Sequence, residues 1–247
     1  MIDSYTHCGI DKYEPVESVV EAMEYSEITR AVLVQHLGQF DNSYIDNVVK
    51  DNPETFTGVG LVDTTDTNWY REIEALRNSD SFMGIRFSSP SILGNFDAVI
   101  EAGQMGLNLI LYTPDGIDEV SQEIAALARK VPDTSIVLTH LGCPEQKVDV
   151  DRRNCSIIRL GEFPNIFVGL SGQHMFCEYP YRNLLVYTKR IVETYTSKRI
   201  MWGSNFPVCG SVEAYRSDLS YISSEHLELS DVEVQDITEN TARNLFF

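Results

Sequence analysis

The sequence predicts a (β/α)8 barrel, in which eight parallel strands form a ring and a helix follows each strand. Along the 247 residues, short runs rich in Val, Ile and Leu alternate eight times with amphipathic segments. Runs of this length and composition are typical of strands covered on both faces. No long linker or low-complexity stretch interrupts the alternation. We therefore expect one domain, residues 1–247, with its active site at the carboxyl ends of the strands.

The expected strands are apolar runs of about five to eight residues. In chain order they are Met1–Thr6, Ala31–His36, Phe56–Asp63, Phe82–Ser88, Leu107–Thr113, Ser135–His140, Ile166–Ser171 and Ile200–Asn205. A doubly wound open sheet would show a similar alternation, and it is the alternative fold. No Gly-x-Gly-x-x-Gly turn follows any of the strands, so the sequence gives no sign of a dinucleotide site.

The segments between the strands have the periodicity of helices. Pro15 is expected at the first helical position, before an apolar stripe with i, i+3, i+4, i+7 spacing formed by Val16, Val19, Val20 and Met23. Comparable stripes run through Trp69–Arg77, Phe96–Gln104, Val120–Lys130 and Leu184–Tyr195. Near the end, Ser230 and Glu233 have the spacing of a capping box, which predicts a terminal helix to Phe247.

Composition narrows the classes of partner. The formal net charge is −18, so a nucleic-acid backbone or an anionic membrane surface would be repelled. The five cysteines include no Cys-x-x-Cys pair, which favours free thiols and a reducing compartment. There is no signal-peptide pattern and no run of about 18 apolar residues. We expect a cytoplasmic protein that binds a small molecule, with no nucleic-acid or membrane partner; a homo-oligomer is possible.

Polar residues end three strands that are far apart in the chain. His7 precedes Cys8-Gly9, His140 precedes Leu141-Gly142, and Asn205 precedes Phe206-Pro207. In a parallel β/α fold, the carboxyl ends of the strands meet at one face. The sequence therefore predicts that His7, His140 and Asn205 converge on a site.

Six motifs carry a resemblance to a known family. They are Ile2-Asp-Ser-Tyr-Thr-His7, Gly84-Ile-Arg-Phe87, Ile136-Val-Leu-Thr-His-Leu-Gly142, Ile166-Phe-Val-Gly-Leu-Ser-Gly172, Met201-Trp-Gly-Ser-Asn-Phe-Pro-Val208 and Glu239-Asn-Thr-Ala-Arg-Asn-Leu-Phe246. Together, and in this order, they resemble the amidohydrolase-related family 2, which includes the pyrone-dicarboxylate lactonase and is similar to zinc-dependent barrel decarboxylases. The resemblance spans nearly the whole chain and implies a (β/α)8 barrel hydrolase.

The chain departs from the pattern of this family at its metal ligands. Family members usually have a His-x-His pair on the first strand, but here Tyr5 takes the place of one histidine beside His7. The last strand more often ends in Asp, and here it ends in Asn205, whose amide is neither a general base nor a good ligand for a divalent ion. Tyr112 ends the fifth strand, where metal-dependent relatives would offer His or Lys. We therefore expect no metal and no other cofactor.

Hydrolysis without a metal needs a base, donors to the oxyanion and a cation for any substrate carboxylate. Arg86 is the expected carboxylate-binding residue, because a guanidinium can bind a carboxylate through two hydrogen bonds. His140 is the first choice for the base and His7 the second, with an apparent pKa near 6.5 that burial or neighbours would shift. Tyr5 and Asn205 are the expected neutral donors. Each of these residues could instead cap its strand and pair with its neighbours.

Four further residues are weaker candidates for binding the substrate. They are Tyr112, His36, Ser171 and His174, all close to strand ends. Cys8, Cys143, Cys177 and Cys209 also follow strands, so an unusual metal site or a reactive thiol is conceivable there, although small apolar packing is the simpler role.

The sequence therefore predicts a lactonase-like hydrolase of the amidohydrolase kind that acts on a small, carboxylated lactone or cyclic ester. A decarboxylase or hydratase of the same family is one alternative. A non-catalytic barrel that only binds a ligand is another.

Overall fold

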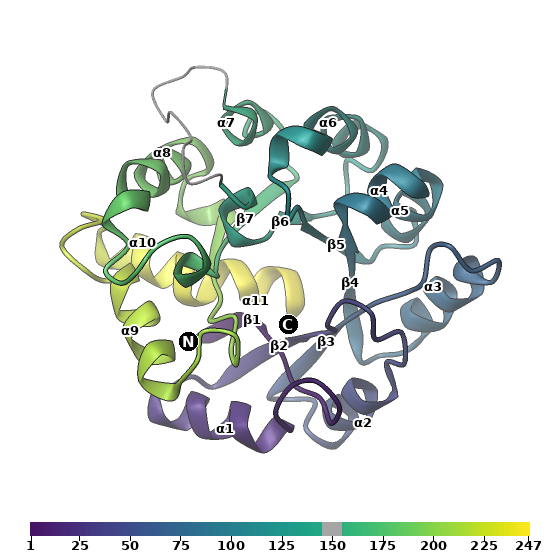
Figure 1. The fold of residues 1–247 in the computed structure, drawn as a ribbon, viewed down its shortest axis with the longest axis horizontal. Helices are drawn as coiled ribbons and strands as arrows, with labels where there is room; N and C mark the ends of the chain where they lie inside the picture. The colour runs from purple at the N-terminus through teal and green to yellow at the C-terminus, as the bar shows by residue number, and fades with distance from the viewer. Residues whose placement is uncertain (145–154) are drawn as a thin grey trace.

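Eight parallel strands form one sheet in the order β1 to β8 in the computed structural model, which describes residues 1–144 and 155–247. The strands are β1 Ile2–Thr6, β2 Arg30–Val34, β3 Phe56–Gly60, β4 Phe82–Ser88, β5 Asn108–Tyr112, β6 Ile136–Leu138, β7 Ile166–Leu170 and β8 Ile200–Trp202. Helices surround the strands (Figure 1). The prediction of a (β/α)8 barrel is confirmed.

The helices lie between consecutive strands and after the last one. They are α1 Val16–Tyr25, α2 Ser43–Asp51, α3 Trp69–Asn78, α4 Ser89–Gly94, α5 Phe96–Gln104, α6 Ser121–Lys130, α7 Ser156–Leu160, α8 Leu185–Tyr195, α9 Val212–Ile222, α10 Asp231–Gln235 and α11 Thr241–Phe246. The short 3-10 turns are Ile117–Val120, His140–Gly142, Gln173–Met175, Arg182–Leu184 and Ser197–Arg199.

Two helix predictions need correction. Pro15 is the residue before α1 rather than its first residue. Its fixed φ of −63° is close to a helical value, so it restricts the backbone directly before the helix begins. The terminal helix is not uniform, because a π-helical stretch, Asp236–Asn240, lies between α10 and α11. The predicted capping box is present, with the Ser230 hydroxyl accepting from the Glu233 amide.

Several strands also end earlier than predicted. His36, His140, Ser171 and Asn205 lie one to three residues beyond β2, β6, β7 and β8. At two of these positions the backbone turns into the left-handed region, with φ 53° at His140 and 56° at Asn205. A residue in that conformation cannot continue a strand. These side chains therefore belong to the loops that follow the strands.

Hydrogen bonds between the end of β1 and the loop after β8 close the ring. Asn205 N donates to the Tyr5 carbonyl and His7 N to the Phe206 carbonyl, both at 2.8 Å. Gly203 permits this approach, because a Cβ at that position would lie 2.6 Å from Tyr5 Cβ and 2.9 Å from Tyr5 N.

The inside of the barrel differs between its two ends. At the amino end, apolar side chains of the strands pack with Ala242 and Phe246 of α11. Asn108 Nδ2 also donates to the Leu245 carbonyl at 2.7 Å, which ties α11 to β5. This end is filled with side chains, so the polar residues of the interior lie toward the carboxyl ends of the strands. None of the helices in the described part of the chain has the length and hydropathy that a membrane crossing requires.

Candidate active site

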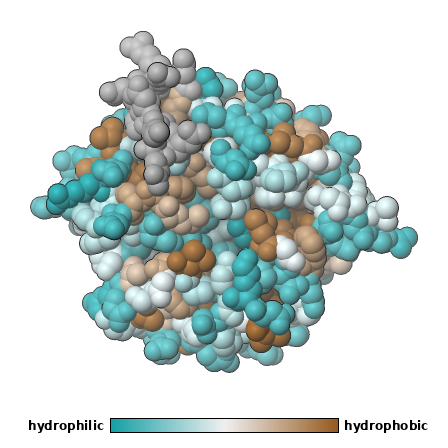
Figure 2. Space-filling view, in the orientation of Figure 1, coloured by the Kyte–Doolittle hydropathy of each residue, from teal (hydrophilic) through white to brown (hydrophobic). Residues whose placement is uncertain are grey.

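A cavity of about 170 Å³ opens among the loops that follow the strands. Its walls are formed by His7, Lys12, Tyr13, Leu37, Arg86, Tyr112, His140, Met175, Asn205 and Val208. The space-filling view shows hydrophobic residues near the middle of one face of the molecule, within a rim that is mostly hydrophilic (Figure 2). The structure thus brings together His7, His140, Asn205 and Arg86, which lie far apart in the sequence.

His7 has a defined tautomer. Its Nδ1 lies 2.6 Å from the Val34 carbonyl oxygen, which can only accept a hydrogen bond. The neutral ring must therefore carry its proton on Nδ1, which leaves the lone pair on Nε2. Burial, with a further contribution from the Arg86 charge, lowers the pKa of His7 to about 3, so the free protein holds this ring neutral across the physiological range.

His140 contacts Ser171 instead of a carbonyl group. The Ser171 hydroxyl accepts from the His140 amide at 3.2 Å and lies 2.9 Å from His140 Nδ1. Because a hydroxyl can donate or accept, this contact allows either tautomer of His140. Burial lowers the pKa of His140 well below 6.5, and the charge of Arg86 lowers it further.

Tyr5 lies between the two histidines. Its ring makes edge contacts with His7 and His140, with ring centroids 5.0 Å and 4.9 Å apart. Its hydroxyl is buried and has no hydrogen-bond partner. Burial raises the pKa of the Tyr5 phenol to about 12, so the group is neutral and able to donate a hydrogen bond.

Arg86 is the buried cation of the site, with 5% of its surface exposed. Its Nη1 donates to the Gln35 carbonyl at 3.0 Å, while its Nε has no partner. The guanidinium carbon lies 5.0 Å from the centre of the Tyr112 ring and 5.7 Å from that of Tyr5. A guanidinium held between two aromatic rings with unused donors is well suited to binding a carboxylate.

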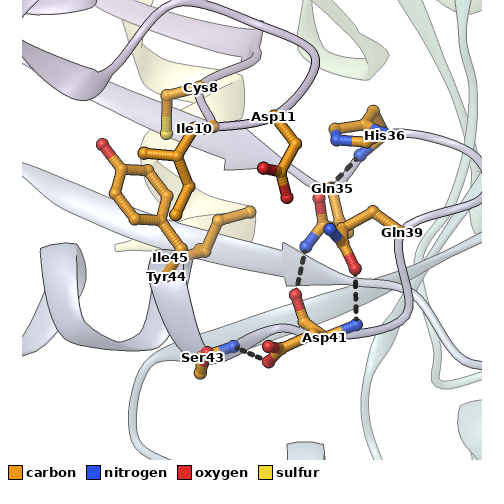
Figure 3. A pocket seen from close by; sticks show the side chains of 11 residues that line it. Cys8, Ile10, Asp11, Gln35, His36, Gln39, Asp41, Ser43, Tyr44 and Ile45 are labelled. Carbon is orange, nitrogen blue, oxygen red and sulfur yellow. Dashed lines mark hydrogen bonds between the residues drawn. The ribbon is translucent and has the colours of Figure 1, made fainter.

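The Gln35 side chain fixes the backbone to which Arg86 donates its hydrogen bond. Its Nε2 donates to the Asp41 carbonyl at 2.9 Å, and its Oε1 accepts from the His36 amide at 3.0 Å (Figure 3). These bonds anchor the loop between β2 and α2, and they hold the Gln35 carbonyl that accepts from Arg86.

Asn205 and His174 meet at another edge of the cavity. Asn205 Nδ2 lies 3.4 Å from His174 Nε2 and 3.5 Å from Met175 Sδ. His174 is therefore a neighbour of Asn205 and is not one of the cavity-lining residues. Asn205 keeps a polar group at the cavity wall, where it can reach a ligand.

Two residues of the loop after β1 were not singled out in the sequence. Tyr13 stacks on His7, with centroids 5.0 Å apart and an angle of 15° between the rings, and it also makes an edge contact with His36. Lys12 lines the cavity, and its Nζ lies 5.4 Å from the centre of the Tyr13 ring. His36 is thus separated from the cavity by Tyr13. The signal that could have identified this loop is its position directly after His7.

A second buried polar group, here called the outer cluster, lies on the α9 side of β1 and comprises Asp3, Trp202, Ser204, Tyr215 and Asp218. Asp3 accepts from Ser204 N at 2.9 Å, from Ser204 Oγ at 2.6 Å and from Tyr5 N at 3.1 Å. Trp202 Nε1 donates to Asp218 at 2.9 Å. Burial raises the pKa of Asp3 to about 6 and that of Asp218 to about 7, despite the lowering effect of these bonds. Asp3 thereby ties β1 to the loop that carries Asn205.

The cavity is a poor match for a divalent metal ion. Its lining includes no Asp, Glu or Cys, and it contains two cations, Arg86 and Lys12. The neutral phenol of Tyr5 and the amide of Asn205 are weak ligands. The charge of Arg86, which already disfavours a proton on either histidine, would also oppose a metal cation.

The five cysteines are free thiols. Across residues 1–144 and 155–247, no group of three or more His, Cys, Asp or Glu side chains is placed to hold a metal ion. Burial raises the pKa of Cys8 to about 12 and that of Cys143 to about 11, so neither is activated as a thiolate. Cys8 packs in the hydrophobic core as a small apolar side chain.

Comparison with known proteins supports the resemblance found in the sequence. The family described as Amidohydrolase matches residues 7–247. No significantly similar sequence was found among curated proteins.

Among solved structures, the chain is similar to a protein from Pseudomonas putida assigned as a 2-pyrone-4,6-dicarboxylic acid hydrolase, with 20% identity, a TM-score of 0.80 and coverage of 99% of this chain and 96% of the other. It is also similar to an amidohydrolase from Burkholderia multivorans with bound zinc, with 16% identity, a TM-score of 0.78 and coverage of 99% and 98%. A third is a 5-carboxyvanillate decarboxylase from Sphingomonas paucimobilis, with 15% identity, a TM-score of 0.65 and coverage of 100% and 98%. At these identities the similarity establishes a shared fold.

Proposed function

The chain belongs to the amidohydrolase family, and from this we propose that it hydrolyses a small carboxylated lactone or related cyclic ester by attack of water, without an obligatory metal. One observation carries the proposal. Two buried neutral histidines and a buried arginine with unused donors line one cavity, and that cavity has no carboxylate of its own. In a chain of net charge −18, such a cavity favours an anionic ligand.

Arg86 binds the substrate carboxylate in this proposal. The guanidinium offers donors in a planar fork, and its position between Tyr5 and Tyr112 restricts its movement. Lys12 adds a second positive charge at the wall of the cavity. A carboxylate bound here also neutralises the charge that lowers the pKa of His7 and His140, so substrate binding makes both rings stronger bases.

His7 is the base best supported by the hydrogen bonds, which reverses the order expected from the sequence. Its Nδ1 proton is held by Val34, so its Nε2 lone pair is available to accept a proton from water. The water oxygen bonds to the ester carbonyl carbon as its proton passes to Nε2. The ring C–O bond then breaks, and the leaving oxygen takes the proton back from the imidazolium.

Tyr5 and Asn205 supply neutral hydrogen-bond donors for the oxyanion that forms on the carbonyl oxygen. The Tyr5 hydroxyl is buried and unpartnered, and Asn205 Nδ2 lies 3.4 Å from His174 Nε2 and 3.5 Å from Met175 Sδ. The Asn205 side chain also hydrogen-bonds to His7, which places it next to the proposed base. Donors that are already in place stabilise the developing charge without reorganisation. His140 acts as a second neutral ring beside Tyr5, and Ser171 holds it in position.

The test is a panel of small lactones, with and without a carboxylate, incubated with protein that has been dialysed against a chelator. Ring opening of the carboxylated members, at a rate that the chelator leaves unchanged, is the expected result. Loss of activity with the chelator and its return with zinc would contradict the metal-independent proposal. Release of CO2 without ring opening would identify a decarboxylase, and saturable binding without turnover would identify a binding protein.

A further inference from the structure

A second hollow, here called the side groove, lies beside the catalytic cavity and has a volume of about 320 Å³. The loops after β2 and β3 and the helix α4 form it, and its apolar walls are Leu37, Phe40, Leu61, Val62 and Pro90. Leu37 lines both the cavity and the groove. The two spaces are therefore neighbours that share one side chain as their boundary.

The apolar side chains at the edge of the groove are exposed to water. Leu37 is 36% exposed and Phe40 is 43% exposed, whereas Leu61 and Val62 beneath them are buried. Water against exposed apolar surface is released when an apolar group binds there, which favours binding. The groove thus offers binding energy directly beside the proposed position of the substrate.

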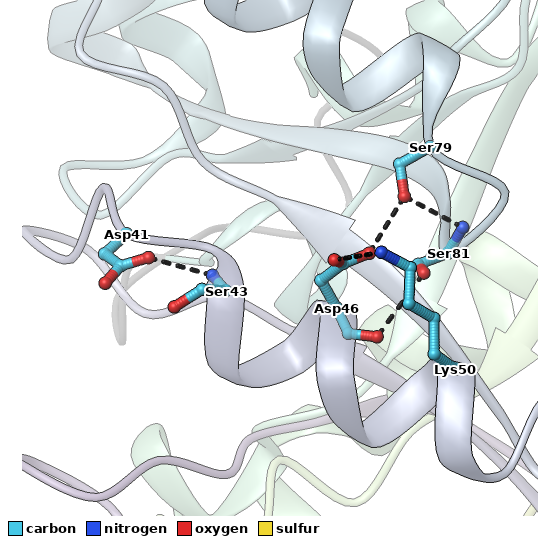
Figure 4. Close-up of polar contacts among 6 residues, drawn as sticks. All are labelled: Asp41, Ser43, Asp46, Lys50, Ser79 and Ser81. Atoms are coloured by element: carbon cyan, nitrogen blue, oxygen red, sulfur yellow. Dashed lines mark hydrogen bonds and ion pairs between the residues drawn. The ribbon is translucent and has the colours of Figure 1, made fainter.

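The loop that carries Leu37 and Phe40 is anchored at both ends. At its start, the Gln35 side chain bonds to Asp41 and His36 (Figure 3). At its end, Asn42 accepts from the Leu61 amide and donates to the Leu61 carbonyl. Asp41 also accepts from the Ser43 amide at the start of α2, and Asp46 of α2 bonds to Ser79 and Lys50 (Figure 4). The exposed side chains are therefore presented by a loop with many hydrogen bonds.

We propose that the side groove binds an uncharged apolar substituent, alkyl or aryl, of the substrate whose carboxylate is held by Arg86. The charges support this division. The two cations, Arg86 and Lys12, line the cavity, whereas Asp63 is the charged residue that lines the groove, and it would repel a second carboxylate. The substrate is then amphipathic, with its acidic end in the cavity and its apolar end past Leu37. This inference rests on the proposed role of Arg86, but it concerns binding and can be tested without turnover.

The test measures the affinity of straight-chain carboxylates, from propanoate to octanoate, by calorimetry. Beyond the length that fills the cavity, each added methylene buried in the groove should raise affinity by about two- to fourfold in the wild-type protein. Phe40→Ser and Leu37→Ser should flatten this dependence on chain length. Leu93→Ser is the matched control, because Leu93 is 52% exposed on α4, the helix that contributes Pro90 to the groove, but does not itself line the groove. It should keep the wild-type slope.

Any of three results would overturn the proposal. They are an affinity that does not depend on chain length, a slope that Leu93→Ser flattens as much as Phe40→Ser does, and no binding of any carboxylate. Arg86→Lys should weaken every member of the series by a similar factor, which links the groove to the acidic end of the ligand. If lactones are not hydrolysed but the chain-length dependence is as expected, the proposed hydrolysis is wrong and the groove assignment stands.

Discussion

The cavity lined by His7, Arg86 and His140 and the outer cluster lie on opposite sides of β1, and burial changes their charges in opposite directions. In the cavity, burial lowers the pKa of His7 and His140 and so removes positive charge. In the outer cluster, burial raises the pKa of Asp3 and Asp218 and so removes negative charge. Both effects favour neutral groups. The two cationic side chains, Arg86 and Lys12, line the cavity, so the difference between the two regions favours binding of an anion on that side of the strand.

The largest expected effect of a substitution is at His7, in the cavity. If its Nε2 accepts the proton from water, His7→Ala should lower kcat by about 10²–10⁴-fold, because that is the usual contribution of a general base. His140→Ala should lower kcat less. His36→Ala is the control, since Tyr13 separates His36 from the cavity. Steady-state kinetics of the three variants measure this, and a larger loss in His140→Ala than in His7→Ala would restore His140 as the base.

Arg86→Lys should lower kcat/KM by about 10- to 100-fold, mainly through KM, because a lysine cannot reproduce hydrogen bonds from a planar fork.

The acid limb of the pH profile gives a second measurement on the wild-type protein. The apparent pKa in kcat should lie above that in kcat/KM, because a bound carboxylate offsets the Arg86 charge that lowers the pKa of the histidines. Equal values in the two profiles would argue against Arg86 as the carboxylate site.

Asp218 of the outer cluster should affect stability rather than turnover. The pKa of Asp218 is raised to about 7 in the folded chain, so the native state holds a proton that the unfolded state releases. This contribution is fully present at low pH and is lost as pH rises through 7. Between pH 6 and 8 the wild-type free energy of unfolding should fall by about 1.4 kcal/mol on this account, and Asp218→Asn should remove that decrease.

Urea unfolding at several pH values measures the effect, with the exposed Asp80→Asn as the control. The histidines act in the opposite direction in the same pH window. Because His7 and His140 stay neutral in the folded chain while unfolded histidines release their protons near pH 6.5, they make the native state more stable as pH rises from 6 to 8. Both histidines are present in the wild type and in Asp218→Asn, so the difference between the two pH dependences isolates the contribution of Asp218. An Asp218→Asn variant with the wild-type pH dependence would show that its carboxyl does not titrate near 7.

The smallest expected effect concerns Asp3, which joins the two regions. Asp3→Asn keeps an oxygen for the Ser204 and Tyr5 amides but weakens the 2.6 Å bond from the Ser204 hydroxyl. We expect kcat to fall by less than about tenfold with KM little changed, because only the placement of Tyr5 and Asn205 is altered. A wild-type kcat in this variant would mean that the outer cluster does not position the catalytic cavity.

Much of the fold could be read from local sequence. The eight apolar runs, the capping box at Ser230 and the stripes of α1, α3, α5, α6 and α8 all depend on the spacing of neighbouring residues. The same reasoning located Arg86, His7, His140 and Asn205, because the carboxyl ends of parallel strands meet at one face. The carboxyl ends of the strands were placed too late, since a backbone turn such as that at Asn205 has no strong local signal.

The sequence by itself determined the alternation of elements and the identity of the polar residues near the strand ends. The tertiary structure determined whether each strand residue faces the interior of the barrel or the helices around it. A register shift in β1 between Asp3 and Thr6 places Tyr5 in the interior while Asp3 joins the α9 side, although simple alternation puts both on one face. The tertiary structure also determined three further contacts. It placed the Val34 carbonyl beside His7, brought Lys12 and Tyr13 to the cavity, and put Leu37 between the cavity and the side groove. Each depends on contacts between segments far apart in the chain, which local spacing does not encode.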